Sequence, residues 1–320
     1  MRLIAAAAVA LALPAFALAA TLPPLDHNGI TADAWTTVDR QPGNPAYGFG
    51  SVWVPSSGSG TLDRVNPKTL RVVAHIHSTK VFNPPQNQYF DSVALSRTAV
   101  WHASDEGNQV IRINPRTNRV VAKIAAGGRP DEIAAGPSDV YVGLFNTLTV
   151  ERITTKVVKK RNLPGSVLGM AYGGGHLWAL YGTTVAQLNP VTLAVMKRIS
   201  VESTLPLVGG FAPAWWISAD AKTVCVGNLQ QNAVSIIDPA TSKVTAVALP
   251  FGKQPFSVAA DNGKCWVTND SGVFLAGTDG ADPAYSHLPA HGASTFTGVA
   301  AGGGGAWVTL AGKNALVRVR

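Results

Sequence analysis

Two pairs of adjacent acidic residues, Asp105–Glu106 and Asp131–Glu132, are well suited to chemistry in this chain. Carboxylate oxygens are ligands for Ca²⁺ and Mg²⁺, and an acid close to an imidazole such as that of His102 can transfer protons. One hypothesis is therefore a catalytic group made of His102, Glu106, Asp131 and Glu132, with a divalent ion as its cofactor. The alternative is that these acids are solvated and bind nothing.

A larger set of aromatic and amide side chains is typical of a binding surface for a peptide, a sugar or a flat organic ligand. The alternative is that the rings cover the core beneath them and that the Asn and Asp residues make turns. The residues proposed to bind ligand are Tyr47, Tyr89, Phe211, Asn228, Phe256, Asn269, Asp270 and Asn314.

The segment His75-Ile76-His77 places two imidazoles on one face of an expected strand, a spacing that a metal ion could use. No acid or cysteine is close in sequence, so we expect both histidines to face solvent. The chain has neither a G-x-S-x-G motif nor a phosphate loop that ends in Gly-Lys-Ser/Thr.

These residues must be positioned by a repeated unit, because the chain matches itself at a period of about 42 residues. The segment from Gly50 (GSVWVPSSGSGTLDRVNPKTLRVVAHI) resembles the segment from Thr98 (TAVWHASDEGNQVIRINPRTNRVVAKI). Each unit alternates apolar and polar residues as strands do, with Gly-rich and Asn-Pro turns between them. The aligned position is occupied by Trp53, Trp101, Tyr141, Trp178, Cys225, Trp266 and Trp307.

Seven such units predict an all-β fold, a seven-bladed β-propeller with four antiparallel strands in each blade. The last unit stops after a third strand, Leu316–Val319, and a matching strand, Ala34–Val38, lies near the start of the chain. Pairing of these strands would complete the last blade, close the ring and leave no open sheet edge there. We expect one propeller domain over residues 20–320.

Three segments carry a resemblance to known propellers: Cys265–Asn269 (CWVTN), Val234–Asp238 (VSIID) and Gly252–Phe256 (GKQPF). They look like YVTN-repeat propellers, and the whole array resembles the bacterial propellers related to streptogramin B lyase, the virginiamycin B lyase-like group. The resemblance covers nearly all of residues 20–320. It is specific for the fold and says little about function, because most of these residues make turns and contacts between blades.

Resemblance to the lyase group implies a His and Glu residues near the channel, assisted by a divalent metal. In that group the His directly precedes the first strand of a blade. The comparable places here read Pro130-Asp131-Glu132-Ile133 and Phe296-Thr297-Gly298-Val299, and His291 lies seven residues before Gly298. This departure argues against the same lyase chemistry.

Residues 1–19 are typical of a signal peptide: Arg2 is followed by an apolar run that ends in Ala17-Leu18-Ala19. The run is about 16 residues, shorter than the ~20 that span a membrane. We expect no transmembrane segment and a periplasmic or secreted protein. The formal net charge of +8 is scattered except for the run at 156–161 (KVVKKR), so nucleic acid is not the expected partner.

Export would permit a disulfide between Cys225 and Cys265, the only two cysteines. Stacked sheets lie about 10 Å apart, whereas a disulfide needs Cβ atoms about 3.8 Å apart. Only a close approach of two blades near the axis would allow the bond, so the sequence leaves open whether it forms.

Two inter-blade loops are longer than the others, near residues 81–88 and 201–208, and both fall on one face around the channel. Long loops on a rigid scaffold are a common place for binding. We therefore expect an exported, non-catalytic binding propeller that recognises a protein segment, an envelope component or a small ligand on the channel face. The alternative is a metal-assisted lyase or hydrolase.

Overall fold

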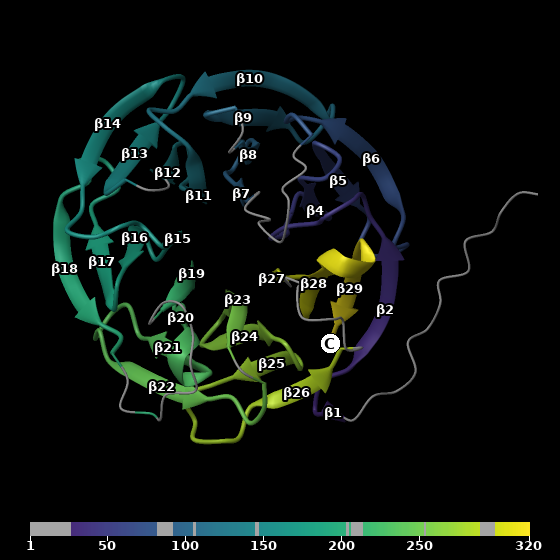
Figure 1. The fold of residues 1–320 in the computed structure, drawn as a ribbon, viewed down its shortest axis with the longest axis vertical. Helices are drawn as coiled ribbons and strands as arrows, with labels where there is room; N and C mark the ends of the chain where they lie inside the picture. The colour runs from purple at the N-terminus through teal and green to yellow at the C-terminus, as the bar shows by residue number, and fades with distance from the viewer. Residues whose placement is uncertain are drawn as a thin grey trace, which may run out of the picture.

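The structure is a computed structural model that describes residues 27–81, 92–104, 107–144, 147–202, 205, 214–252, 254–288 and 298–320. Seven antiparallel sheets stand around a central axis, each with its first strand innermost and its fourth on the outer rim (Figure 1). Apart from two 3₁₀ turns, η1 (Leu229–Gln231) and η2 (Ala311–Lys313), the elements of the described chain are strands. The prediction of a seven-bladed propeller is confirmed.

The strands of the first four blades follow one another in chain order from the axis outward. Blade 1 contains β3 (Ala46–Gly48), β4 (Ser51–Ser56), β5 (Thr61–Val65) and β6 (Val72–His77). Blade 2 contains β7 (Val93–Leu95), β8 (Val100–Ser104), β9 (Gln109–Asn114) and β10 (Arg119–Ala125). Blade 3 contains β11 (Pro130–Ala135), β12 (Val140–Leu144), β13 (Thr149–Ile153) and β14 (Val157–Asn162). Blade 4 contains β15 (Gly169–Gly173), β16 (His176–Tyr181), β17 (Thr184–Leu188) and β18 (Val195–Ser200).

The remaining blades include the two short strands from the start of the described chain. Blade 5 contains β19 (Trp215–Ala219), β20 (Val224–Asn228), β21 (Ala233–Ile237) and β22 (Val244–Ala248). Blade 6 contains β23 (Pro255–Asp261), β24 (Lys264–Asn269), β25 (Gly272–Ala276) and β26 (Ala284–His287), and β1 (His27–Asn28) adds to its outer edge. Blade 7 contains β27 (Val299–Ala301), β28 (Ala306–Leu310), β29 (Ala315–Val319) and β2 (Ala32–Thr37).

The repeated aromatic position explains why the blades share one geometry. The indole N–H groups of Trp53, Trp178 and Trp307 each donate to the backbone carbonyl five residues earlier, at the end of the preceding strand, at 3.1–3.2 Å. All three rings are buried between neighbouring sheets. One side chain thus fills the core between two blades and fixes the hairpin that leads into its own strand.

Ring closure takes place in blade 7. β2 pairs antiparallel with β29, and Arg318 on β29 forms an ion pair with Asp33 on β2 at 2.7 Å. The predicted closing strand, placed at Ala34–Val38, is confirmed, and in the structure it spans Ala32–Thr37. A strand from one end of the chain and three from the other therefore share a single sheet.

The two cysteines form a disulfide that joins blades 5 and 6. Cys225 lies on β20 and Cys265 on β24, and their Cα atoms are 5.9 Å apart. The sequence left this bond open because the usual spacing of stacked sheets is too wide for it. Here Cys225 replaces the aromatic ring that separates the sheets elsewhere, and both cysteines are fully buried.

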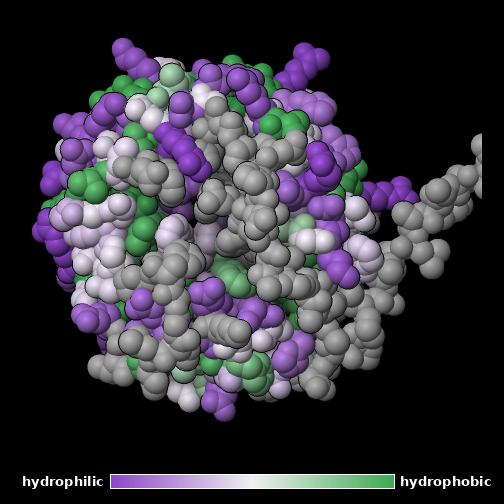
Figure 2. Space-filling model, viewed as in Figure 1, coloured by the Kyte–Doolittle hydropathy of each residue, from purple (hydrophilic) through white to green (hydrophobic). Residues whose placement is uncertain are grey.

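The face seen in Figure 2 carries hydrophilic residues interspersed with apolar ones around the rim of the ring. Within the described part of the chain, no helix has both the length and the apolar character needed to cross a membrane.

Candidate functional site

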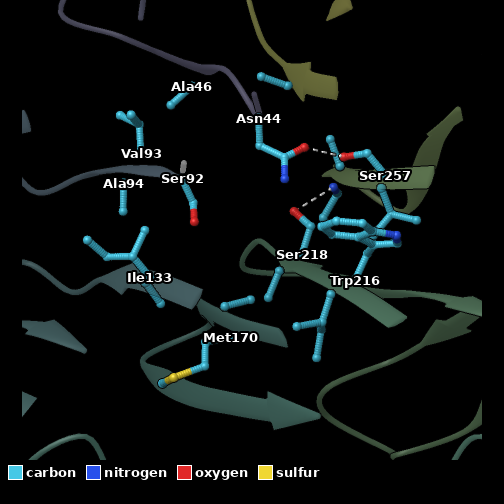
Figure 3. Close-up of a pocket in the computed structure, with 18 of the residues that line it drawn as sticks. Asn44, Ala46, Ser92, Val93, Ala94, Ile133, Met170, Trp216, Ser218 and Ser257 are labelled. Carbon is cyan, nitrogen blue, oxygen red and sulfur yellow. Dashed lines mark hydrogen bonds between the residues drawn. The ribbon is translucent and has the colours of Figure 1, made fainter. Parts of the chain in front are cut away.

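A cavity of about 340 Å³ lies on the axis and is lined by the first strands of all seven blades (Figure 3). Small residues keep it open. In six blades an alanine pairs with the aromatic residue of the second strand, and in blade 5 Ser218 pairs with Cys225. The channel is therefore a property of the repeat itself.

Two residues before this small residue, each blade contributes one position to a ring around the channel, at the end where the chain enters the first strands. Polar or aromatic side chains occupy five of these positions, and Gly169 and Gly298 occupy the other two. We call the five the channel ring, and all of them line the cavity: Asn44, Ser92, Glu132, Trp216 and Ser257.

Hydrogen bonds link residues of the channel ring to one another and to other blades. The Ser257 hydroxyl donates to Oδ1 of Asn44 at 2.9 Å and accepts the backbone N–H of Val299. The Ser92 hydroxyl donates to the backbone carbonyl of Asp131 in the next blade at 2.7 Å. These contacts hold the ring in place, as a preorganised site requires.

Glu132 is the one residue with a carboxyl group in the described lining of the cavity. Burial and the neighbouring Asp131 carboxylate raise its pKa well above the usual range, against the effect of a hydrogen bond with the Met170 backbone. A carboxyl group of this kind stays protonated to higher pH than an exposed glutamate, and it can then donate a hydrogen bond to an uncharged ligand.

Trp216 reaches the cavity because its backbone is distorted. It is the extra residue of a β-bulge between Trp215 and Ile217, and its φ of 66° lies in the left-handed region. This conformation is unfavourable for a bulky side chain, and strain of this kind is concentrated at functional sites. The bulge directs an indole toward Asn44 and Ser257 (Figure 3).

Of the residues predicted from the sequence, the structure brings Tyr47 and Glu132 to the cavity. The Tyr47 ring stacks on Trp307 with ring centroids 6.5 Å apart, so packing uses one of its faces. His102 is fully buried, hydrogen bonded to the Ser78 hydroxyl at 2.9 Å, and Asp131 is also buried. Neither lines the cavity. Glu106, Tyr89 and Phe211 lie outside the described residues, as do most of the two long loops.

The amide residues proposed as ligand contacts make structural hydrogen bonds in the structure. Asn228 donates to Ser235, Asn269 donates to the carbonyl of Phe251, and Asn314 accepts the backbone N–H of Gln41. Phe256 is the extra residue of a second bulge and is partly buried, and Asp270 is exposed. None of these five predicted residues lines the described cavity.

Sequence reasoning missed Asn44, Ser92, Trp216 and Ser257. Counting back two residues from the small position of each repeat would have found all four, because the register places these positions at one level of the channel. The search followed loops rather than the first residues of the inner strands.

A second group of titratable residues lies away from the channel, where the closing segment after β2 meets blade 1. His75 Nδ1 lies 2.8 Å from Asp63 Oδ1 and 3.1 Å from Asp39 Oδ2, and Thr61 donates to Asp39. Half of the His75 side chain is exposed, as the sequence predicted, and although no acid is close to it in sequence, the fold brings two acids to it in space. Both acids come from other segments of the chain, and the three residues place ligand atoms within 4.8 Å of one another.

The electrostatics of this group favour the protonated forms of His75 and Asp63 and the ionised form of Asp39. Burial raises the pKa of Asp63 to about 6. Although partial burial opposes it, the charge of Asp63 and hydrogen bonds to both acids raise the pKa of His75. Burial also opposes the hydrogen bonds from Thr61 and His75 that lower the pKa of Asp39.

Comparison with solved structures identifies propellers of several functions. Virginiamycin B lyase from Staphylococcus aureus matches with a TM-score of 0.70 and 14% sequence identity, over 89% of this chain and 97% of that chain. Hydrazine synthase from Kuenenia stuttgartiensis matches with a TM-score of 0.68 and 14% identity, over 88% and 95%. The Pan2 WD40 domain of Neurospora crassa matches with a TM-score of 0.66 and 13% identity, over 89% and 94%.

No family model matches the chain, and no curated protein matches it by sequence. At such identities the structural matches establish the fold alone. The chain is a seven-bladed β-propeller, and its resemblance to the virginiamycin B lyase-like propellers is confirmed at the level of the fold.

Proposed function

We propose that this protein is an exported binding propeller that takes an uncharged small ligand, or one uncharged side chain of a peptide, into the channel ring. The observation that carries the proposal is the lining of the cavity. It offers an amide, two hydroxyls, a carboxyl group with raised pKa and an indole, all at one level. Such groups recognise hydrogen-bonding and flat apolar surfaces rather than ions.

The absence of charge partners in the cavity supports binding rather than catalysis. Glu132 is accompanied by no Lys, Arg, His or Cys in the described lining of the cavity. Proton-transfer catalysis generally uses a paired acid and base within hydrogen-bond reach of the reacting atoms. The other predicted catalytic residues in the described chain, His102 and Asp131, are buried outside the cavity.

A second candidate function is lyase or hydrolase activity, which the raised pKa of Glu132 favours. Glu132 has the raised pKa that suits a general acid at neutral pH, and one of the similar structures is a catalytically inactive variant of virginiamycin B lyase with quinupristin. Quinupristin is therefore a defined probe for the alternative. Chromatography after incubation with Mg²⁺ should recover the compound unchanged; conversion that Glu132→Gln abolishes would favour the enzyme.

The binding proposal is tested by native mass spectrometry of the protein isolated from periplasm or culture medium. Wild type should carry an additional small mass. Trp216→Gly, which removes the indole and suits the left-handed backbone, should lose it. Bare wild-type protein, or a mass that Trp216→Gly retains, would contradict binding at the channel ring.

Export is tested separately by sequencing the amino terminus of the isolated protein. Cleavage after Ala19 predicts a chain that begins at Ala20. A chain that still begins at Met1 would contradict the proposal of a signal peptide.

A further inference from the structure

A second cavity, of about 680 Å³, lies on the end of the propeller opposite the channel ring, between blades 1 and 2. It is formed by the turns that join first to second and third to fourth strands, and all of its lining lies in the described chain. The residues that line it are Phe49, Arg64, Arg97, Thr98, Asn114, Pro115 and Arg116.

The three arginines bring positive charge that no carboxylate neutralises among the described residues. Arg97 and Arg116 are exposed, and the structure gives their guanidinium groups neither an ion pair nor a hydrogen bond. Arg64 is positioned by Ser51, by the Pro115 carbonyl and by Asn118. Guanidinium groups bind carboxylate and phosphate through paired N–H donors, so the cavity suits an oxyanion.

The equivalent arginines in other blades show what is missing here. Arg152 in blade 3 pairs with Asp139 at 2.7 Å, and Arg318 in blade 7 pairs with Asp33 at 2.7 Å. Arg64, Arg152 and Arg318 occupy the same register position in their blades, opposite the aromatic residue of the second strand. The third-strand arginine of blade 1 thus lacks the acid that neutralises Arg152 and Arg318; among the described residues, Arg112 at the same position of blade 2 has no ion pair either.

Phe49 is an independent sign of a ligand. Phe49-Gly50 forms a two-residue hairpin with φ of 52° and 66°, and the same hairpins in blades 4 and 6 use Gly174-Gly175 and Asn262-Gly263. Glycine and asparagine tolerate this backbone, whereas phenylalanine is strained in it. Phe49 as a residue is also 37% exposed, so packing in the core does not compensate for the strain.

We infer that this cavity binds a small anion that carries a planar ring beside its carboxylate or phosphate group. The ring lies against Phe49, and the oxyanion takes the free donors of Arg97 and Arg116, with Arg64 adding charge beneath them. The volume is within the 300–1,000 Å³ that small-molecule sites span.

Calorimetric titration with two anions and their uncharged analogues tests this inference. The probes are 5′-AMP against adenosine, for a phosphate ligand, and phenylacetate against phenylacetamide, for a carboxylate ligand. One anion should bind at least about tenfold more tightly than its analogue and more tightly than inorganic phosphate or acetate. The anion that binds more tightly than its analogue shows whether the natural ligand carries a phosphate or a carboxylate group.

Two variants assign the binding to this cavity. Arg97→Ala combined with Arg116→Ala should weaken it by about tenfold or more, because two charged contacts are lost. Phe49→Asn should weaken it severalfold yet raise the midpoint of thermal unfolding by about 2–4 °C, because asparagine relieves the strained hairpin. Trp216→Gly, at the opposite end, should leave it unchanged.

The inference is overturned if neither anion exceeds its uncharged analogue in affinity. It is equally overturned if the double arginine variant binds as wild type does, or if Phe49→Asn gains stability without losing affinity.

Discussion

Blades 1 and 3 place the same kinds of charge at the same positions but neutralise them differently. In both, a fully buried acid on the third strand accepts a backbone N–H from the incoming connection, Asp63 from Asp39 and Glu151 from Gly127. In blade 3 the acid pairs with Lys160 at 2.7 Å. In blade 1 the same register position holds His75.

The two blades differ at one residue of the segment that leads into them, which is Asp39 for blade 1 and Gly127 for blade 3. A side chain at Gly127 would collide with Glu151 and Lys160, so blade 3 has room only for a complete ion pair. Blade 1 has Asp39 there instead, and its two acids share one histidine. The third-strand arginines differ between the two blades in the same way. Arg152 of blade 3 pairs with Asp139, whereas Arg64 of blade 1 has no ion pair with a described carboxylate. In blade 3 the buried acid and the third-strand arginine therefore each have an ion-pair partner, whereas in blade 1 a histidine takes the place of the lysine and Arg64 has no described carboxylate.

The largest expected effect comes from breaking the pair in blade 3. Lys160→Met leaves the buried Glu151 carboxylate without its cation and should lower the free energy of unfolding by about 2–3 kcal/mol. This is below the full value for a buried pair because the Lys160 side chain is 55% exposed. Urea denaturation measures the change.

The matched control is Lys123→Met in blade 2, where the facing residue of the third strand is Ile111. Removal of that charge should change stability by less than about 0.5 kcal/mol. Equal losses in the two variants would show that Glu151 does not depend on its cation.

A smaller effect is expected from the pH response of blade 1. Asp63 ionises near pH 6 in the folded protein and near 3.8 when unfolded, so stability falls as pH rises between these values. The pKa of His75 is raised, so its contribution is present below about 6.5 and is lost as pH rises through its folded value. Asp39, whose pKa is lowered, contributes stability above pH 3.8 that is lost as the pH falls below that value.

Asp63→Asn should therefore flatten the stability curve between about pH 4 and 6 by roughly 1–2 kcal/mol relative to wild type. Denaturation at several pH values measures it. His77→Gln, two residues along the same strand as His75, should keep the wild-type slope. If the stability curve of Asp63→Asn ran parallel to that of wild type, Asp63 and His75 would not be the cause of the pH dependence.

The smallest expected effect comes from giving blade 1 the arrangement of blade 3. Ser51 in blade 1 occupies the position of Asp139 in blade 3, and each contacts the third-strand arginine of its blade. Ser51→Asp should neutralise Arg64 and weaken anion binding between blades 1 and 2 by about threefold to fivefold in the same titration.

The reverse change, Asp139→Ser, should lower stability by about 1 kcal/mol without affecting anion affinity. If Ser51→Asp left the affinity unchanged while folding normally, Arg64 would have no part in anion binding.

The repeat explains why the fold was predictable and why the sites were only partly so. An aromatic residue at the aligned position of six units, and an Asn-Pro turn in three of them, indicate the repeat and with it strand order, register and closure. Glu132 and Tyr47 were found because they lie near the inter-blade loops that lead into the inner strands. Trp216 was missed because the loops, and not the position two residues before the small residue of each repeat, guided the choice of candidates; its bulge and positive φ had no sequence signal of their own.

The two charge clusters were missed for a different reason. Asp39 and His75 are separated by 36 residues in sequence, and Arg64 and Arg116 belong to different blades. Such neighbours follow from the packing of blades, which a search for local motifs cannot detect.

The most direct test of the binding proposal compares two strained aromatic residues at opposite ends of the ring. Native mass spectra of wild type, Trp216→Gly and Phe49→Asn should show a small uncharged ligand on wild type and Phe49→Asn, and none on Trp216→Gly. A bare wild-type protein, or a ligand that remains on Trp216→Gly, would contradict a binding site at the channel ring.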